Sequence, residues 1–323
     1  MLRLQRQGRS SVDHVIGITG TIFAVISVGY LAKKSKIFKG DALEPLGQFV
    51  VLIALPALVF RAISTQDIRT IADVGYLGGY LIGSLTILFL GYAVAGRFRP
   101  TSPVQRTFDA AGMTCANSGF VGYPLLLLAT PAVAPTALAL NMIVENLIII
   151  PLVIVLAEIF SGRARGAEIA LTVAKRLMSN PIVLAMLMGL GVVLLELKVP
   201  APVERTIDIL ASSSIAISLF VIGGTVAGVS LNRIGLRVSM ITFGKLIAMP
   251  LAVWFGFMIM ALTGAGVEDP ELRKAAILMA ATPAMTIYPL LAQRYGQAET
   301  AATAMLVMTI LSFLTLSAFL YVL

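Results

Sequence analysis

Charged residues are scarce in this sequence. They make up 12% of its 323 residues, whereas an average soluble domain carries about 25%. Hydrophobic residues account for 58% of the chain. Because so few charges cannot cover a folded surface that faces water, the composition excludes a soluble enzyme of this size.

The sequence also has a single cysteine, Cys115, and a single histidine, His14. One cysteine cannot form an internal disulfide, and thiolate zinc or iron–sulfur centres need several. One histidine at the start of the first apolar stretch cannot build a histidine metal cluster and does not favour a Ser/His hydrolase. An intramembrane protease would need two aspartates in mid-span, whereas Asp109 and Asp208 lie at the ends of apolar stretches. We therefore expect neither an enzyme nor a bound cofactor or metal.

Long apolar stretches fill most of the chain. A membrane-spanning helix needs about 20 residues, and ten stretches of about this length can be distinguished, separated by short loops with proline, glycine and charge. We expect an all-α integral membrane protein of ten transmembrane helices in the inner (plasma) membrane of the cell. The stretches lie near residues 15–32, 43–63, 74–96, 107–129, 134–157, 180–197, 206–230, 238–262, 272–293 and 299–322.

The positive charges of the loops predict the orientation. The net charge of +8 comes mainly from Lys and Arg between the apolar stretches, which is typical of a topology signal and not of a nucleic-acid-binding surface. These residues are more numerous on the side opposite the N-terminus, so the positive-inside rule places both termini outside. The basic connection over residues 161–179 is then cytoplasmic, and its composition permits a helix on the membrane surface.

The two halves of the chain resemble each other. Tyr123-Pro124-Leu125-Leu126 reappears as Tyr288-Pro289-Leu290-Leu291, and the same shift superimposes most of the apolar stretches. Because each half holds five stretches, the second must enter the membrane upside down, as in the inverted repeats of secondary transporters. We predict a first repeat over residues 1–160, a connecting loop over 161–179 and an inverted repeat over 180–323.

The fourth and ninth stretches carry prolines, small residues and hydroxyls near mid-span. Proline removes a backbone donor, and freed backbone groups in hydrocarbon must bond to protein, water or a ligand. Matching positions in the repeat predict two broken helices, interrupted near 117–119 and 283–285, that cross near mid-membrane and suit an anion. Ordinary proline kinks are the alternative, and the polar side chains can equally cap broken ends. The candidate substrate-binding residues are Asn117, Ser118, Gly119, Tyr123, Pro124, Thr282, Pro283, Thr286, Tyr288 and Pro289.

Glu145 is an acidic residue in the middle of the fifth stretch, with Asn141 one turn away on the same face. An ionised carboxylate at the centre of a bilayer costs about 2.5–3.5 kcal/mol, so Glu145 must be protonated, paired or beside water. Lys245 in the eighth stretch is the expected partner. Two alternatives stay open, namely a static pair that joins two helices and a site of proton or ion coupling.

With these residues the chain resembles the auxin efflux carrier family, which includes plant auxin exporters and bacterial permeases for malonate, malate and related acids. Asn117 followed by Pro124 is similar to the first crossover segment of the family. The run from Thr282 to Pro289 is similar to the second crossover, and Thr309 and Ser312 fit the closing helix.

The resemblance implies a scaffold of helices 1, 2, 6 and 7 and a transport bundle of helices 3–5 and 8–10. Helices 4 and 9 would cross in the bundle, and an elevator-like movement would expose the site to each side of the membrane in turn. The connection between helices 5 and 6 is much shorter than in plant members, and the proline spacing of the second crossover differs. We therefore expect a small organic acid as substrate in place of auxin.

The function that we expect is secondary active transport of small organic anions, carboxylates such as malonate or malate, bound at the crossing. A sodium-coupled symporter, a sodium/proton antiporter of the same fold and a channel remain alternatives, although neither break contains the carboxylate that such antiporters place near their crossing. The expected partners are the organic acid, protons or sodium ions, the lipid bilayer and a second copy bound through the scaffold helices, without nucleic acid.

Overall fold

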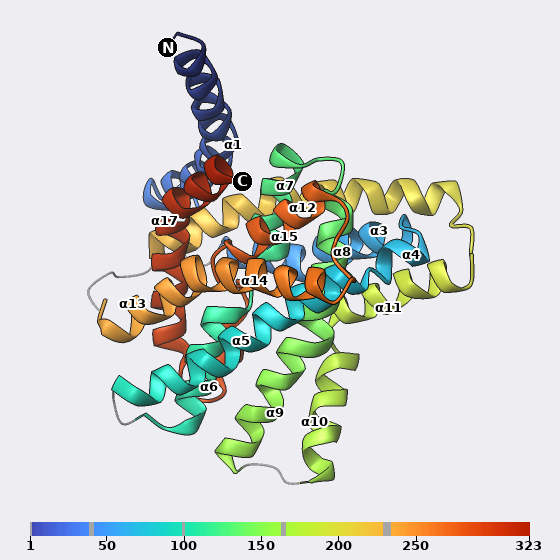
Figure 1. Cartoon of the computed structure of the whole chain (residues 1–323). Coiled ribbons are helices and arrows are strands. Elements are labelled where there is room, and N and C mark those ends of the chain that lie inside the picture. Colours follow the sequence, from blue (N-terminus) through green and yellow to red (C-terminus); the bar gives the residue numbers. More distant parts are fainter. Residues whose placement is uncertain (1, 39–41, 99–100, 163–165, 229–233) are drawn as a thin grey trace.

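The computed structural model describes residues 2–38, 42–98, 101–162, 166–228 and 234–323. These residues form helices joined by short loops (Figure 1). The β-type pairing found among them is one isolated antiparallel bridge between Ala116 and Ala284. The described chain is therefore all-α, as the apolar stretches predict.

The helices are numbered in chain order, and π-helical turns are written η. The elements are α1 (Leu2–Lys34), α2 (Glu44–Phe49), η1 (Val50–Ala54), α3 (Leu55–Ser64), α4 (Ile68–Ile71), α5 (Val74–Phe98), α6 (Pro103–Thr114), η2 (Ser118–Gly122), α7 (Tyr123–Ala129), α8 (Ala134–Val144), η3 (Glu145–Ile149), α9 (Ile150–Ser161), α10 (Ala167–Met178), α11 (Pro181–Leu194), α12 (Ala201–Gly228), α13 (Leu236–Phe243), η4 (Gly244–Ala248), α14 (Met249–Leu262), α15 (Pro270–Ala280), α16 (Tyr288–Gln293) and α17 (Ala298–Val322).

Within the described ranges, seven helices are long and apolar enough to cross a membrane, and the bent pair α10–α11 would make an eighth. The predicted stretches 107–129 and 272–293 are not among these helices, because an interruption divides each of them into shorter helices. Ten crossings and their inverted arrangement therefore remain a prediction. The seven are Asp13–Lys34, Glu44–Ser64, Ile68–Arg97, Ala134–Ser161, Ala201–Ala227, Leu236–Leu262 and Ala298–Val322.

Three of the shorter helices begin at a polar residue followed by proline. The side chains of Ser102, Asn180 and Asp269 each accept a hydrogen bond from a backbone amide in the following turn. The proline at the first helical position has no amide to satisfy. These caps set where α6, α11 and α15 start.

The helices pack as two groups. In the first group α12 contacts α1 and α3, and α3 contacts α11; the second group consists of α5, α6, α8, α9, α13, α14 and α17. The closest approach within the second group is that of α5 to α14, where a Cβ on Gly256 would overlap the backbone carbonyl of Gly79 and one on Gly83 would overlap the backbone of Val253. Small residues thus allow two long helices to pack backbone to backbone. The two groups meet where α1 contacts α17 and where α3 contacts α8.

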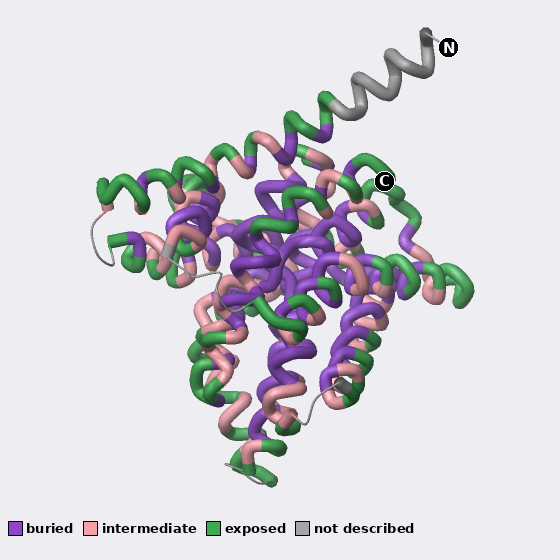
Figure 2. Tube along the Cα trace, turned by 90° about the vertical axis from the view of Figure 1, so that its left-hand side faces the viewer, coloured by how far each residue is buried: buried purple, intermediate pink, exposed green. Residues whose placement is uncertain are grey.

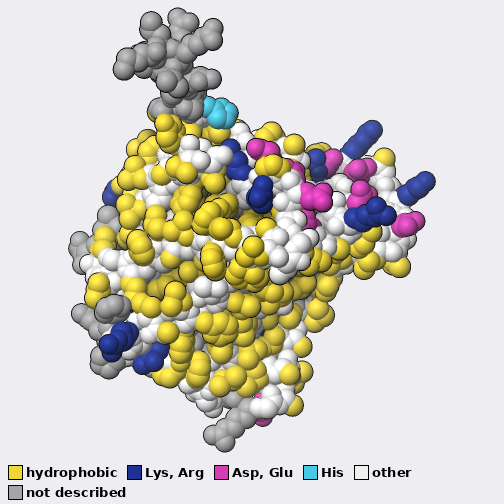
Figure 3. All heavy atoms as spheres, viewed as in Figure 1, with side chains coloured by type: hydrophobic (Ala, Val, Ile, Leu, Met, Phe, Trp, Pro, Cys, Tyr) yellow, Lys and Arg dark blue, Asp and Glu magenta, His cyan; other side chains and the backbone are white. Residues whose placement is uncertain are grey.

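The outer surface is broadly apolar. Buried residues occupy the interior along the whole length of the packed helices (Figure 2). Large side chains such as Trp254, Phe255 and Leu314 are more than half exposed, and hydrophobic side chains cover most of the face in Figure 3, with charges gathered toward its margins. An apolar surface of this extent suits a lipid bilayer.

The two ends of the chain lie on the same side of the molecule, and α9 and α10 project on the opposite side (Figure 1). A hydrogen bond of 3.1 Å from Ser317 Oγ to Thr19 Oγ1 joins α17 to α1. In the connection over residues 161–179, α10 forms a helix that is bent by 74° against α11 and has no buried residue. The connection therefore forms a helix, and its position on the membrane surface stays a prediction.

Candidate functional site

Both predicted interruptions are present. The first covers residues 115–117, between α6 and η2, and begins two residues before the predicted 117–119. The second covers residues 281–287, between α15 and α16, and includes the predicted 283–285. The alternative of simple proline kinks is wrong for these two stretches, because neither continues as a helix.

The two interruptions bond to each other through their backbones. The amide of Asn117 donates to the carbonyl of Pro283 at 2.9 Å, and the amide of Met285 donates to the carbonyl of Cys115 at 3.3 Å. These groups have no partner in their own helices. Each interruption therefore provides hydrogen-bond partners for backbone groups that the other leaves free. These bonds hold the two segments side by side.

Four prolines shape the turns that hold the polar residues. Proline has no N–H and clashes with the carbonyl four residues earlier, and a wider π-turn before it relieves that clash. Every described π-turn is followed by a proline at the same spacing, so the sequence sets their positions. The turns η1, η2, η3 and η4 precede Pro56, Pro124, Pro151 and Pro250, and they place Ser118 and Glu145 at the start of a turn and Lys245 within one.

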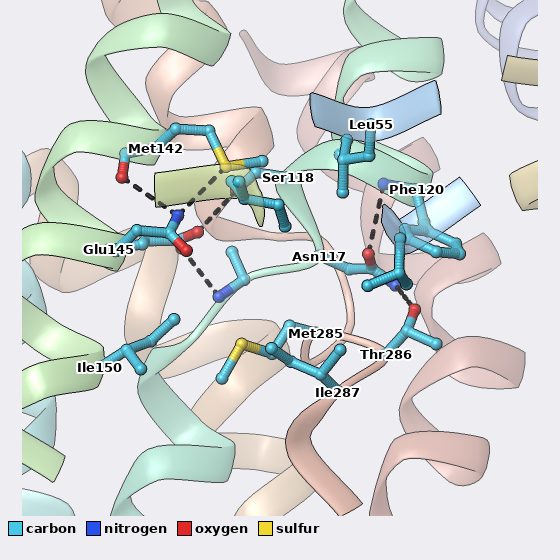
Figure 4. A pocket seen from close by; sticks show the side chains of 15 residues that line it. Leu55, Asn117, Ser118, Phe120, Met142, Glu145, Ile150, Met285, Thr286 and Ile287 are labelled. Atoms are coloured by element: carbon cyan, nitrogen blue, oxygen red, sulfur yellow. Dashed lines mark hydrogen bonds between the residues drawn. The ribbon is translucent and has the colours of Figure 1, made fainter. Parts of the chain in front are cut away.

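A cavity of about 50 Å³ lies beside the two paired interruptions (Figure 4). It has room for about three or four water molecules. Its polar lining comes from Asn117, Ser118, Glu145, Asn146 and Thr286, and its apolar lining includes side chains of η1, α3 and α11. Four of the predicted substrate-binding residues thus line one cavity with Glu145, namely Asn117, Ser118, Gly119 and Thr286.

Asn117 joins the two interruptions with its side chain. Its Oδ1 accepts from the amide of Phe120 at 3.3 Å, and its Nδ2 donates to Thr286 Oγ1 at 3.1 Å. Asn117 therefore caps the start of η2 and also lines the cavity. Ser118 and Gly119 are the first residues of η2, where backbone amides have no carbonyl of their own helix to bond. The start of η2 consequently presents amide groups beside the cavity.

Glu145 lies in a network of hydrogen-bond donors. Its Oε1 accepts from the amide of Ala116 at 2.8 Å and from the hydroxyl of Tyr80 at 3.3 Å. Its Oε2 accepts from Ser118 Oγ at 2.9 Å. Behind them, Asn141 Nδ2 donates to Ser118 Oγ at 2.7 Å and to the hydroxyl of Tyr80 at 3.1 Å. The carboxyl group thus bonds to a backbone amide that the first interruption frees.

Lys245 is fully buried, and its Nζ donates to the carbonyl of Ala280 at 2.7 Å. The ion pairs found among the described residues do not include Lys245 and Glu145, so these two form no direct salt bridge. The carbonyl of Ala280 is one that α15 leaves free at its end. Lys245 therefore provides a donor for a free carbonyl at the second interruption, just as Glu145 provides an acceptor for a free amide at the first.

Six of the predicted residues lie in or directly after the two interruptions and do not line this cavity. Thr282 Oγ1 accepts from the amide of Asn117 at 3.1 Å. The hydroxyl of Tyr288 donates to the carbonyl of Phe108 at 2.8 Å, which ties α16 to α6. Of the others, Pro283 lies within the second interruption, and the remaining three are at the starts of α7 and α16, the helices that follow the interruptions. The six are Tyr123, Pro124, Thr282, Pro283, Tyr288 and Pro289.

Sequence reasoning missed Tyr80, which is fully buried in α5 beside Glu145. One signal could have found it, because Tyr80 occupies the position in the first repeat that Lys245 occupies in the second. Both residues reach toward an interruption from the neighbouring helix. The alignment of the two halves therefore marks Tyr80 as a candidate functional residue, although it does not predict the contact of Tyr80 with Glu145.

Sequence reasoning also placed Asp109 at the end of a stretch, whereas it lies within α6 and is 1% exposed. Arg237 Nε donates to its two carboxylate oxygens at 2.8 and 2.9 Å. The same guanidinium donates to Gln297 Oε1 at 3.0 Å and to Thr300 Oγ1 at 3.3 Å. This buried pair fastens α6 to the starts of α13 and α17, and nothing in the spacing of these residues predicts it.

In the part of the chain that the structure describes, no three His, Cys, Asp or Glu side chains lie close enough to hold a metal ion. The cavity offers amides, hydroxyls and one carboxyl group. These groups suit a small polar molecule and a proton.

A family profile described as membrane transport protein matches residues 15–320. A Rhizobium meliloti protein that carries the provisional name malonate transporter is 28% identical over 311 residues, which cover 95% of each chain. The uncharacterized transporter YfdV of Escherichia coli K12 is 24% identical over 92% of this chain and 94% of its own. The lysosomal cholesterol signaling protein of Mus musculus is 27% identical over 64% of this chain, which is 25% of its own length.

The profile match and the two full-length relatives cover both interruptions, the cavity and Glu145. With the apolar surface and the seven to eight candidate spans, they identify a multi-pass membrane protein. The chain belongs to the membrane transport protein family, which is the auxin efflux carrier family that its two crossover segments resemble.

Proposed function

We propose that this protein is a secondary active transporter of small organic anions, carboxylates such as malonate or malate. The observation that carries the proposal is the cavity at the crossing, where Asn117, Ser118 and Thr286 offer hydrogen-bond donors beside the start of η2. Amide and hydroxyl donors at a helix start bind carboxylates well. The relative in Rhizobium meliloti, which is named for malonate, supports this substrate class.

Alternating exposure of the cavity by an elevator-like movement belongs to the same proposal. The cavity lies between the two helix groups, with Leu55 and Ile182 from the first group and the crossing from the second. The first group would be the scaffold and the second the transport bundle of a ten-helix inverted repeat. A bundle that moves against the scaffold would carry the cavity with it, since the crossing is bonded within the bundle.

Proton coupling would act through Glu145. This carboxyl group lines the cavity and is 4% exposed, so its charge and that of a bound anion would lie close together. Protonation of Glu145 removes this repulsion, and binding of a proton would then favour binding of the anion.

The test is uptake of radiolabelled malonate by purified protein in liposomes, with mono- and dicarboxylate competitors, at two pH values, with and without sodium. Asn117→Asp keeps the cap on η2 but removes the Nδ2 donors and adds a negative charge at the cavity. We expect uptake to fall tenfold or more. Gln48→Glu, which adds the same charge at an exposed position of α2, should leave uptake unchanged. Saturable carboxylate uptake that survives Asn117→Asp would contradict the site.

The orientation belongs to this proposal as well, with both termini outside the inner membrane and α10 in the cytoplasm. Cys115 is buried, so an impermeant thiol reagent should leave the natural chain unlabelled in intact cells. A cysteine added at either terminus should react, whereas one placed in α10 should react only after the cells are opened. The reverse pattern would invert the topology.

A second candidate is a cation/proton antiporter, and the position of Glu145 favours it more than the sequence does. Although neither interruption contains an acidic residue, Glu145 contacts the first one through the amide of Ala116. Sodium or potassium added to liposomes that hold a pH gradient separates the two functions. Collapse of the gradient without any organic acid, together with no carboxylate binding, would establish the antiporter and refute the anion transporter.

A further inference from the structure

The hydrogen atoms around Glu145 can be assigned from its contacts. Asn141 Nδ2 carries two hydrogens, and it has two acceptors, the oxygens of Ser118 and Tyr80. Each of these hydroxyls has a single hydrogen of its own. Since each hydroxyl also lies within hydrogen-bonding distance of Glu145, both hydrogens point to the carboxyl group when it is ionised. This arrangement leaves Ser118 with no hydrogen for a ligand in the cavity.

The two carboxyl oxygens of Glu145 differ in how firmly they are bonded. Oε1 accepts from the amide of Ala116 at 2.8 Å, and this backbone group cannot turn away. Oε2 accepts from the hydroxyl of Ser118, which can rotate. A proton that binds to Glu145 therefore goes to Oε2 and is donated to Ser118 Oγ.

We infer that Ser118 couples the protonation of Glu145 to anion binding. This inference rests on the proposed function. When Oε2 carries a proton, Ser118 Oγ accepts hydrogen bonds from Glu145 and Asn141, and these fill both of its lone pairs. Its own hydrogen must then leave Glu145, and it turns to the cavity that Ser118 lines, where it is donated to the bound anion. No heavy atom has to move for this exchange.

Ser118 both bonds to Glu145 and lines the cavity beside it, whereas other titratable side chains face Glu145 alone. They are Tyr80 and Tyr76 from α5, Cys115 from the first interruption and Lys245 from η4. None of these four lines the cavity. Lys245 bonds to Ala280, and Tyr80 shares Oε1 with the immobile amide of Ala116. Of the described side chains that hydrogen-bond to Glu145, Ser118 is therefore the one that can pass a change in its charge to the ligand as a hydrogen bond.

The test is a double-mutant cycle on malonate affinity, measured by calorimetry on purified protein. The four proteins are wild type, Ser118→Ala, Glu145→Gln and the double variant, at a pH high enough that wild-type affinity no longer changes with pH. Glu145→Gln imitates the protonated carboxyl group, because its amide nitrogen can donate to Ser118. In that background Ser118→Ala should weaken binding about tenfold, and in the wild-type background about twofold or less, within the usual range of coupling between sites.

An equal cost of Ser118→Ala in both backgrounds would refute the coupling while leaving the proposed function intact. Malonate binding that is absent in wild type and in Glu145→Gln at every pH would refute both. Ser118→Thr retains the hydroxyl and should restore the difference between the backgrounds, which separates a lost hydrogen bond from a damaged fold. Ser84→Ala removes a buried hydroxyl of α5 that has no partner in the described structure, and it should behave as wild type in both backgrounds.

Discussion

The two interruptions carry opposite charges. At the first, the carboxyl group of Glu145 accepts from the amide of Ala116, next to the positive start of η2. At the second, the ammonium group of Lys245 donates to the carbonyl of Ala280 at the negative end of α15. Each charge thus compensates the backbone groups and the dipole of the helix end that it faces.

The difference lies in what surrounds each charge. Lys245 makes one hydrogen bond and does not line the cavity. Glu145 has three donors around it, one of which belongs to Ser118 in the cavity wall. A charge with a single backbone partner holds a helix end in place, whereas a carboxyl group inside a rotatable network can gain and lose a proton. We therefore propose a supporting role for Lys245 and a coupling role for Glu145.

The largest expected effect is that of Lys245→Met on stability. It leaves the carbonyl of Ala280 without a donor, and one unsatisfied buried group costs about 1–3 kcal/mol. Glu145 also loses its nearby cation, so we expect roughly 3 kcal/mol, seen as a lower melting temperature in detergent. The exposed substitution Lys198→Met should change little. A double variant with Glu145→Gln should lose less than the sum of the two, because it leaves no unpaired charge.

The next effect is that of Glu145→Gln on coupling. The amide keeps the shape of the side chain, and its oxygen can still accept from the amide of Ala116 and the hydroxyl of Tyr80. It cannot titrate. Exchange of malonate across the liposome membrane should persist, while accumulation driven by a pH gradient should fall tenfold or more. Glu204→Gln at an exposed position of α12 is the matched control. Gradient-driven accumulation equal to wild type would refute proton coupling through Glu145. Its role would then be structural, like the one proposed for Lys245.

A smaller effect is expected from Pro151→Ala, which allows η3 to return to an ordinary α-turn. That change rotates Glu145 relative to α9 by about 100°, the angle between successive helical residues. Gradient-driven uptake should fall several-fold with no loss of melting temperature, since alanine favours the helix. Pro181→Ala, at the first position of α11 and away from any π-turn, should be silent. Unchanged uptake in Pro151→Ala would show that the turn does not position the carboxyl group.

The smallest effect concerns Thr282, whose hydroxyl accepts from the amide of Asn117. Because that amide also donates to the carbonyl of Pro283, Thr282→Val should cost only about 1 kcal/mol. Thr242→Val is the matched control, since the buried hydroxyl of Thr242 has no partner within the described structure. We expect it to be neutral or stabilising in the same melting measurement. A larger loss from Thr242→Val than from Thr282→Val would contradict these hydrogen bonds.

Several features of the site could be predicted because they are local. The prolines and small residues of the two stretches predicted both interruptions, the first to within two residues. The π-turns also have a local cause, since each described one stands at the same distance before a proline. Caps such as that of Ser102 on α6 follow from short motifs. The prediction of the two interruptions succeeds because the backbone conformation depends on neighbours in sequence, and the π-turns and caps depend on sequence in the same way.

The partners of the buried charges could not be predicted in this way. Lys245 was the partner expected for Glu145 from the sequence, whereas the structure gives Glu145 hydrogen bonds from the amide of Ala116 and the hydroxyls of Tyr80 and Ser118. Spacing reveals the depth of a residue and its face on the helix, but not which helix lies opposite. The same reason explains why Asp109 and Arg237 were not recognised as a pair.

The sequence by itself determined that the chain is an apolar helical protein with two breaks at related positions, because composition and proline placement act locally. Tertiary structure alone decided that the breaks bond to each other and that Glu145 meets Ser118 at a cavity. Those contacts depend on how long helices such as α5 and α14 pack, and several packings satisfy the same apolar pattern. Freed backbone groups select among them, because each must find a donor or an acceptor where water is absent.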